Sequence, residues 1–85
     1  MKKNSDDILS IFGNSLREIR KTRGLSQEDL AFRCGLDRTY ISGLERGKRN
    51  PTLKILWIIA NHLNISIDEL LPPMTEANTL NAKDH

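Results

Sequence analysis

The sequence predicts an all-α protein of five short helices and no strands, and three observations lead to this fold class. Apolar side chains recur at the three- and four-residue spacing of an amphipathic helix. Serine, threonine or aspartate precedes most of these apolar runs, as expected of helix N-caps. Glycines follow several of them, where a helix ends in a left-handed residue. With 85 residues, the chain forms one compact domain.

The first predicted helix begins near Ser5 and ends around Thr22 or Arg23. Gly13 lies inside it and, if exposed, weakens it by about 1 kcal/mol relative to alanine. Gly24 follows in the position that favours a left-handed backbone. The apolar residues at helical spacing are Ile8, Leu9, Phe12, Leu16 and Ile19. These side chains predict one face that packs into the core.

The second predicted helix has start and stop signals close together. Ser26 can cap its first turn, and Asp29 can reach back to complete a variant of the capping box. The helix closes at Cys34 and Gly35, where glycine permits the positive φ of a tight turn. Leu36 then enters the core, so the chain turns without leaving the domain.

The third predicted helix starts after Asp37, its N-cap, and covers residues 38–45. Only Ile41 and Leu44 are firmly apolar, so the helix has a narrow anchoring stripe and a wide polar face. A helix with so little apolar surface is expected to contact another molecule.

The fourth and fifth predicted helices supply most of the remaining core. Thr52 caps the fourth helix, whose apolar residues are Leu53, Leu56, Trp57, Ile59, Ala60 and Leu63. Ser66 and Glu69 have the spacing of a full capping box and open a short fifth helix. Leu70 and Leu71 lie in that helix. Trp57 fits the core and an interface equally well.

Two prolines at 72–73 end the last helix and set the domain boundaries. Residues 5–71 are expected to form the folded domain. Residues 1–4 are expected to be a flexible N-terminus, and residues 72–85 a polar, disordered tail.

The charge distribution is more informative than the formal net charge of +2. Between residues 33 and 54 there are six basic and two acidic side chains, a local net charge of +4. The acidic residues occur largely in pairs, at 6–7, 28–29 and 68–69, in predicted first helical turns where the helix dipole favours them. The basic excess has no such structural reason. An excess of positive charge is what a phosphate-contacting surface requires.

The sequence argues against catalysis, a metal site and a cofactor. Cys34 is the single cysteine, and a small packed side chain is favoured over a reactive thiol. His62 has no partner at metal-ligand spacing and fits a helix-capping or surface role. No nucleophile is paired with a base. No apolar run reaches the roughly 20 residues of a membrane span, and no secretion signal is present, so we expect a cytoplasmic protein without membrane contacts.

Residues 26–46 have the parts of a helix-turn-helix: two short helices, a tight glycine turn and an apolar residue that fixes the crossing angle. The matching runs are Leu25–Ala31, Tyr40–Gly47 and Asn50–Leu53. Over roughly residues 12–71 these runs resemble the phage-repressor-type (Cro/repressor) family of DNA-binding domains. More narrowly, Asp37–Gly43 with Arg49–Asn50 resembles the controller proteins of restriction–modification systems, which are small dimeric regulators.

The resemblance implies roles for individual residues. Base contacts are implied for Arg38, Thr39 and Ser42. Phosphate contacts are implied for Gln27, Tyr40, Arg46, Lys48, Arg49 and Asn50. A largely buried structural ion pair is implied for Arg20 and Glu45. A bidentate guanidinium matches guanine in the major groove, so Arg38 is the expected main reader. Many repressors carry a long polar residue where this chain has Gly43. The glycine either removes one possible base reader, which leaves more of the base contacts to Arg38, or allows close helix packing.

Dimerisation is expected because one such domain contacts too few base pairs for useful specificity. The candidate dimer interface is Trp57, Ile65, Ile67, Leu70 and Leu71. The sequence thus predicts a homodimeric transcriptional regulator of palindromic double-stranded DNA, associated with a bacterial or phage nucleoid, with no evident small-molecule effector. The alternative is an antitoxin-like protein-interaction module on a helix-turn-helix scaffold, with a tail that binds a partner.

Overall fold

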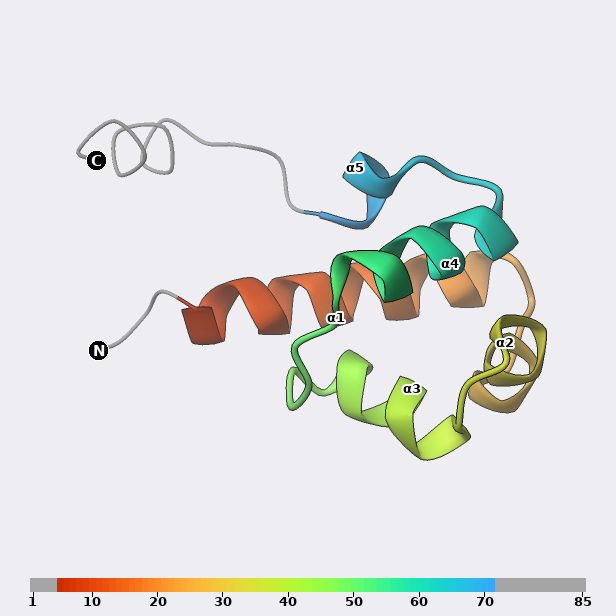
Figure 1. The fold of residues 1–85 in the computed structure, drawn as a ribbon, viewed down its shortest axis with the longest axis horizontal. Coiled ribbons are helices and arrows are strands. Elements are labelled where there is room, and N and C mark those ends of the chain that lie inside the picture. Colours follow the sequence, from red (N-terminus) through yellow and green to blue (C-terminus); the bar gives the residue numbers. More distant parts are fainter. Residues whose placement is uncertain (1–4, 72–85) are drawn as a thin grey trace.

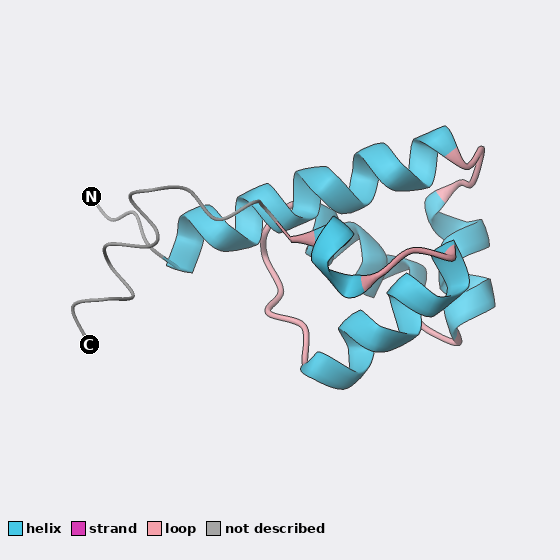
Figure 2. Cartoon of the chain, turned by 90° about the horizontal axis from the view of Figure 1, so that it is seen from above, coloured by secondary structure: helices cyan, strands magenta, loops and turns pink. Residues whose placement is uncertain are grey.

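A computed structural model describes residues 5–71 of the chain, and the expectations for residues 1–4 and 72–85 lie outside this range. The described residues form helices and loops without a strand, which confirms the all-α fold class (Figure 2). The helices are α1 (Ser5–Thr22), α2 (Gln27–Cys34), α3 (Arg38–Glu45), α4 (Leu53–Leu63) and α5 (Ile67–Leu70). The antitoxin alternative depended on the tail, so it too falls outside the described residues.

The helices place α3 and α5 on opposite sides of the domain (Figure 1). The long helix α1 runs through the middle, with α4 alongside it. Helix α3 packs on α1 and α2, and α5 packs on α1 and α4. One side of the molecule therefore carries α3, and the other carries α5.

The core lies between the helices and includes α3. Fully buried side chains come from all five helices, and they are Phe12, Leu16, Leu30, Ile41, Leu44, Ile59, Leu63 and Leu70. Ile41 and Leu44 are the two anchors expected from the sequence, and both are completely inaccessible. Leu36 is partly buried against this cluster and follows Gly35, whose φ of +69° makes the tight turn.

Two predicted N-caps form, with the expected hydrogen bonds. The Ser26 hydroxyl oxygen accepts a hydrogen bond from the Asp29 amide at 2.9 Å, and the Asp29 carboxylate accepts one from the Ser26 amide at 3.0 Å. The Thr52 hydroxyl oxygen accepts from the Ile55 amide at 3.1 Å. Asp37 occupies the N-cap position of α3, but its side chain makes no capping bond.

The predicted capping box of α5 is wrong. The Ser66 hydroxyl donates to the carboxylate of Asp68, and no side-chain capping bond forms. Asp68 is only two residues away and binds the hydroxyl, and the Glu69 amide, which the capping box would place on that hydroxyl, donates to the Ser66 carbonyl oxygen at 3.1 Å instead. The helix is also shorter than expected, because Leu71 has the extended backbone angles φ −101° and ψ 152° and lies outside it.

Gly13 is buried at the crossing of α1 and α3, where the sequence suggested only a weak point in the helix. A Cβ atom at this position would lie 2.5 Å from the carbonyl oxygen of Leu44 and 2.6 Å from that of Glu45. Both neighbours are backbone atoms that cannot move aside alone. Glycine is therefore required for α1 and α3 to approach this closely.

Candidate nucleic-acid interface

Helix α3 divides into an anchoring face and an outward face. Ile41, Leu44 and Glu45 are buried, whereas Arg38 and Thr39 are exposed. Tyr40 and Ser42 are half-buried. The three residues expected to contact bases (Arg38, Thr39 and Ser42) thus belong to the accessible part of α3. The helix presents its N-terminal end, which reaches base edges when such a helix enters a major groove.

A buried ion pair fixes the C-terminal end of α3 against α1. Arg20 donates from Nε to Oε2 of Glu45 at 2.6 Å and from Nη2 to Oε1 at 3.0 Å. Its remaining nitrogen, Nη1, donates to the carbonyl oxygen of Leu25 at 2.7 Å, in the turn between α1 and α2. The hydrogen bonding of Arg20 to the Glu45 carboxylate raises the pKa of Arg20 above its usual value, against the opposing effect of burial. One guanidinium thus ties α1, α3 and the intervening turn together.

Gln27 extends this ion pair towards the surface. Its amide nitrogen donates to Oε1 of Glu45 at 3.0 Å, and its amide oxygen lies 3.4 Å from Nη1 of Arg38. A carboxylate can only accept, so Glu45 determines which end of the amide faces it. The amide oxygen is thereby directed at the guanidinium of Arg38.

The sequence analysis assigned Gln27 only to a phosphate contact and missed this hydrogen-bonded chain. Gln27 and Glu45 are 18 residues apart, and Gln27 and Arg38 are 11 apart. Neither spacing belongs to a local helical pattern, so the packing of α2 against α3 had to be known. Of the expected site residues, the structure joins Arg20, Glu45, Gln27 and Arg38 into one network.

A second pair lies further along α3. Nε of Arg46 lies 3.4 Å from the hydroxyl oxygen of Ser42, so these two expected DNA-contacting residues meet on the protein surface. Both this contact and that between Arg38 and Gln27 are long for hydrogen bonds. Arg38 and Arg46 are exposed, so each can exchange its protein partner for a nucleic-acid oxygen.

The loop between α3 and α4 supplies the remaining basic residues. Lys48, Arg49 and Asn50 are all exposed. The amide of Lys48 donates to the carbonyl oxygen of Gly43 at 2.8 Å, which holds the start of the loop against α3. The guanidinium carbon of Arg49 lies 5.4 Å from the centroid of the Tyr40 ring, within the range of a cation–π contact.

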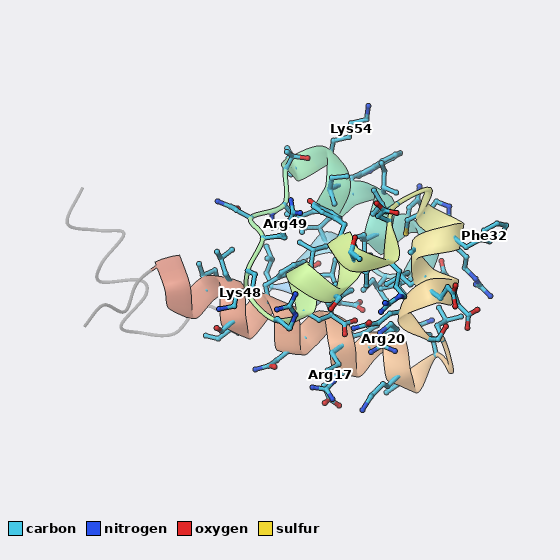
Figure 3. The ribbon with its side chains drawn as sticks, turned by 90° about the horizontal axis from the view of Figure 1, so that it is seen from below. Arg17, Arg20, Phe32, Lys48, Arg49 and Lys54 are labelled. Carbon is cyan, nitrogen blue, oxygen red and sulfur yellow. The ribbon has the colours of Figure 1, made fainter. Side chains whose placement is uncertain are left out.

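Figure 3 looks onto the side of the molecule that carries α3. Lys48 and Arg49 lie beside α3 on this side, Arg17 projects from the edge of α1 that faces away from α3, and Phe32 and Lys54 project at the margins. Arg17 is exposed on α1 and was not among the expected site residues. It also lies outside the basic segment of the sequence.

The residues expected to form a dimer interface differ in burial and line two separate hollows. Leu70 is completely buried within the domain, so it cannot lie at an interface; its side chain is needed to close the core beneath α5. Leu71 lines a hollow of about 150 Å³ with Phe12, Pro51 and Leu56. Trp57, Ile65 and Ile67 line a different hollow, of about 130 Å³, between α4 and α5.

Two of the most exposed apolar side chains lie on α4. Trp57 is 61% exposed, and Leu53, one helical turn earlier on the same face, is 74% exposed. Leu53 was read from the sequence as part of the apolar side of α4, because periodicity does not reveal which side of an apolar helix is covered. Trp57 also lines one hollow with Ile65 and Ile67, and we term these three residues together with Leu53 the α4 patch.

His62 and Cys34 both have structural surroundings. Nδ1 of His62 lies 3.0 Å from the carbonyl oxygen of Ile58, in the last turn of α4. Cys34 is buried, and burial raises the pKa of its thiol. Residues 5–71 contain no cluster of three potential metal ligands. None of the helices described is long and apolar enough to cross a membrane.

Comparisons with known proteins agree on the type of domain. A family model described as "Helix-turn-helix" matches residues 16–70. The chain is 48% identical to the control protein C.SmaI of Serratia marcescens, over 76% of this chain and 77% of that protein. It is 41% identical to the control protein C.BamHI of Bacillus amyloliquefaciens, over 87% of this chain and 93% of that protein.

A solved structure gives the same result. The restriction–modification controller protein C.AhdI of Aeromonas hydrophila matches with a TM-score of 0.73 and 51% identity, covering 74% of this chain and 96% of that one. The tetramer of the controller protein C.Esp1396I in complex with its natural 35-base-pair operator matches with a TM-score of 0.64 and 43% identity, covering 73% of this chain and 92% of that one.

Proposed function

This chain belongs to the helix-turn-helix family, and we propose that it is a transcriptional regulator that binds a palindromic operator as a homodimer. The observation that carries the proposal is that α3 has one buried, anchoring face and one exposed face. Its apolar residues hold it to the core, and its exposed N-terminal end begins with Arg38. This is the arrangement of a recognition helix that enters the major groove.

Arg38 is the proposed main base reader. Its guanidinium is exposed, extends from the first turn of α3, and makes a single long hydrogen bond, to Gln27. A guanidinium can make two parallel hydrogen bonds to O6 and N7 of guanine. Thr39 and Ser42 are close enough along the same helix to contact neighbouring bases.

Phosphate contacts are proposed for the residues around this helix. Gln27 lies at the N-terminus of α2, where backbone amides also favour an anion. The others are Tyr40, Arg46, Lys48, Arg49 and Asn50, which lie on α3 or in the residues that follow it. Each neutralised phosphate adds to the salt dependence of binding.

The α4 patch is the proposed dimer interface. It combines a largely exposed tryptophan with aliphatic side chains, and aromatic anchors of this kind dominate the binding energy of many interfaces. A two-fold pairing brings the same patch of each copy together. The two recognition helices then read two half-sites of one operator, separated by about one helical turn.

The relatives named as control proteins indicate the biological setting. We propose that this chain controls a restriction–modification operon, acting in the cytoplasm on nucleoid DNA of bacterial or phage origin. The proposed role consists of binding and regulation, and it requires neither a catalytic group nor a cofactor.

The test is a salt titration of binding to a duplex that carries the upstream region of the protein's own gene, with a random duplex as reference. Arg38→Ala is expected to lose about 1–3 kcal/mol on the operator and much less on the random duplex. Arg33→Ala is the matched control, because Arg33 is exposed at the end of α2 remote from Gln27. If wild type and Arg38→Ala bind both duplexes equally well, the proposed base reading by α3 is wrong.

A further inference from the structure

Gly43 is buried on α3, between the half-buried Ser42 and the buried Leu44. The atoms that cover it belong to the side chain of Arg49. A Cβ atom built on Gly43 would lie 2.8 Å from Cγ of Arg49, 3.5 Å from its Nε and 3.7 Å from its Cδ. The aliphatic stem of Arg49 therefore crosses α3 in the space that a larger residue at position 43 would fill.

The charged end of the same side chain is also held. Its guanidinium carbon lies 5.4 Å from the centre of the Tyr40 ring, and Tyr40 is one turn before Gly43 on α3. The backbone between Gly43 and Arg49 is fixed as well, because the amide of Lys48 donates to the carbonyl oxygen of Gly43 at 2.8 Å. The glycine, the ring and the loop backbone together hold Arg49 in one orientation.

We propose that Gly43 is a positioning residue for DNA binding, which lets Arg49 lie across α3 so that Tyr40 holds its guanidinium beside the recognition surface. The inference rests on the proposed function and deepens it. Arginine has many rotamers, and ordering them during binding reduces affinity. If the Arg49 side chain is already ordered in the free protein, it loses less conformational entropy when it binds a phosphate or a base edge.

This role predicts opposite effects on stability and binding. Alanine has a higher helix propensity than glycine, and the atoms that an alanine at position 43 would displace belong to a side chain rather than to the backbone. Gly43→Ala is therefore expected to keep or raise the melting temperature while it weakens DNA binding. Gly13 behaves differently, because its close neighbours are backbone carbonyls.

The decisive experiment is a double-mutant cycle on the operator duplex, with Gly43→Ala and Arg49→Ala singly and together. Gly43→Ala alone is expected to weaken binding about threefold to tenfold, the effect of ordering one arginine side chain. In the Arg49→Ala background it should cause no further loss. An equal loss in both backgrounds would mean that the added methyl group disturbs α3 or the DNA directly, and no loss in either would also overturn the inference.

A measurement on the free protein provides a second readout that does not depend on DNA. Protons of the Arg49 side chain should show an upfield ring-current shift in the wild type, because they lie near Tyr40. Gly43→Ala and Tyr40→Leu should both remove this shift, and Tyr40→Phe should keep it, since the ring remains. A shift that survives Gly43→Ala would contradict the inference.

The two proposals fail in distinguishable ways. If wild type binds the operator specifically and Arg38→Ala does not, but Gly43→Ala is neutral, only the positioning role of Gly43 is wrong. If the wild type shows no specific binding to any duplex from a random-sequence selection, both proposals are wrong.

Discussion

Arg20 and Glu45 meet side-on, with two guanidinium nitrogens on the two carboxylate oxygens, although they are 25 residues apart in the chain. Both side chains are almost entirely buried. The pair is the main polar connection between α1 and the C-terminal end of α3. It therefore determines how firmly the recognition helix is held.

Glu45→Ala should lower the free energy of unfolding by about 3–5 kcal/mol, because the guanidinium of Arg20 would remain buried without its partner. Thermal or urea unfolding followed by circular dichroism measures this loss. Replacing both partners, as Arg20→Met with Glu45→Leu, should be less destabilising than Glu45→Ala alone, because no charge is left stranded. A melting temperature unchanged by Glu45→Ala would contradict the structural role.

Gln27→Ala should weaken operator binding by about 0.5–1.5 kcal/mol, because Arg38 would lose the acceptor that orients it. The fold should be little affected, since Glu45 keeps both bonds from Arg20. Comparing affinities in the wild-type and Arg38→Ala backgrounds separates the two roles of Gln27. A loss that is the same in both backgrounds would point to a phosphate contact alone.

Trp57→Glu should weaken the dimer by about 2 kcal/mol or more, because it places a charge at the centre of the α4 patch. Sedimentation velocity over a concentration series measures the dissociation constant. Phe32→Glu is the matched control, since Phe32 is 87% exposed but lies on α2, away from the patch. If both variants stay dimeric, the interface lies elsewhere.

Stability should fall in acid, in part through the cap of α2. Hydrogen bonds from Ser26, first from its backbone amide, lower the pKa of Asp29 below the ordinary value of 3.8. Because the pKa is lower in the folded state, this stabilisation is present above the ordinary value and is lost as the pH falls through the folded pKa. Asp29→Asn should therefore flatten the decline in melting temperature between about pH 4 and pH 2. An unchanged decline would show that other carboxylates dominate it.

The elements of the fold could be predicted from local sequence signals, and the contacts between them could not. Ser26, Thr52 and Gly35 mark helix ends through bonds or backbone angles that involve only near neighbours. Helical spacing likewise identified Ile41 and Leu44 as anchors. Local signals failed at Ser66, whose hydroxyl donates to Asp68 instead of accepting from the Glu69 amide.

The site was harder to predict, because it is assembled from segments that are distant in the chain. The roles of Gln27 beside Arg38 and of Arg49 beside Gly43 depend on how α2, α3 and the following loop pack. Leu70 was misplaced for a related reason, because an apolar residue in a short helix can face either the core or another subunit. Only the packing of α5 shows that it faces the core.

The residues of α3 that hold the helix and those that face outward are different residues. Ile41 and Leu44 are buried, whereas Arg38 and Thr39 contribute nothing to the core. A lineage carrying this fold can therefore acquire new outward side chains, and with them new cognate sites, without losing thermal stability. Regulators of this build can diverge quickly in target preference, so that neighbouring genetic systems within one cell need not interfere with each other.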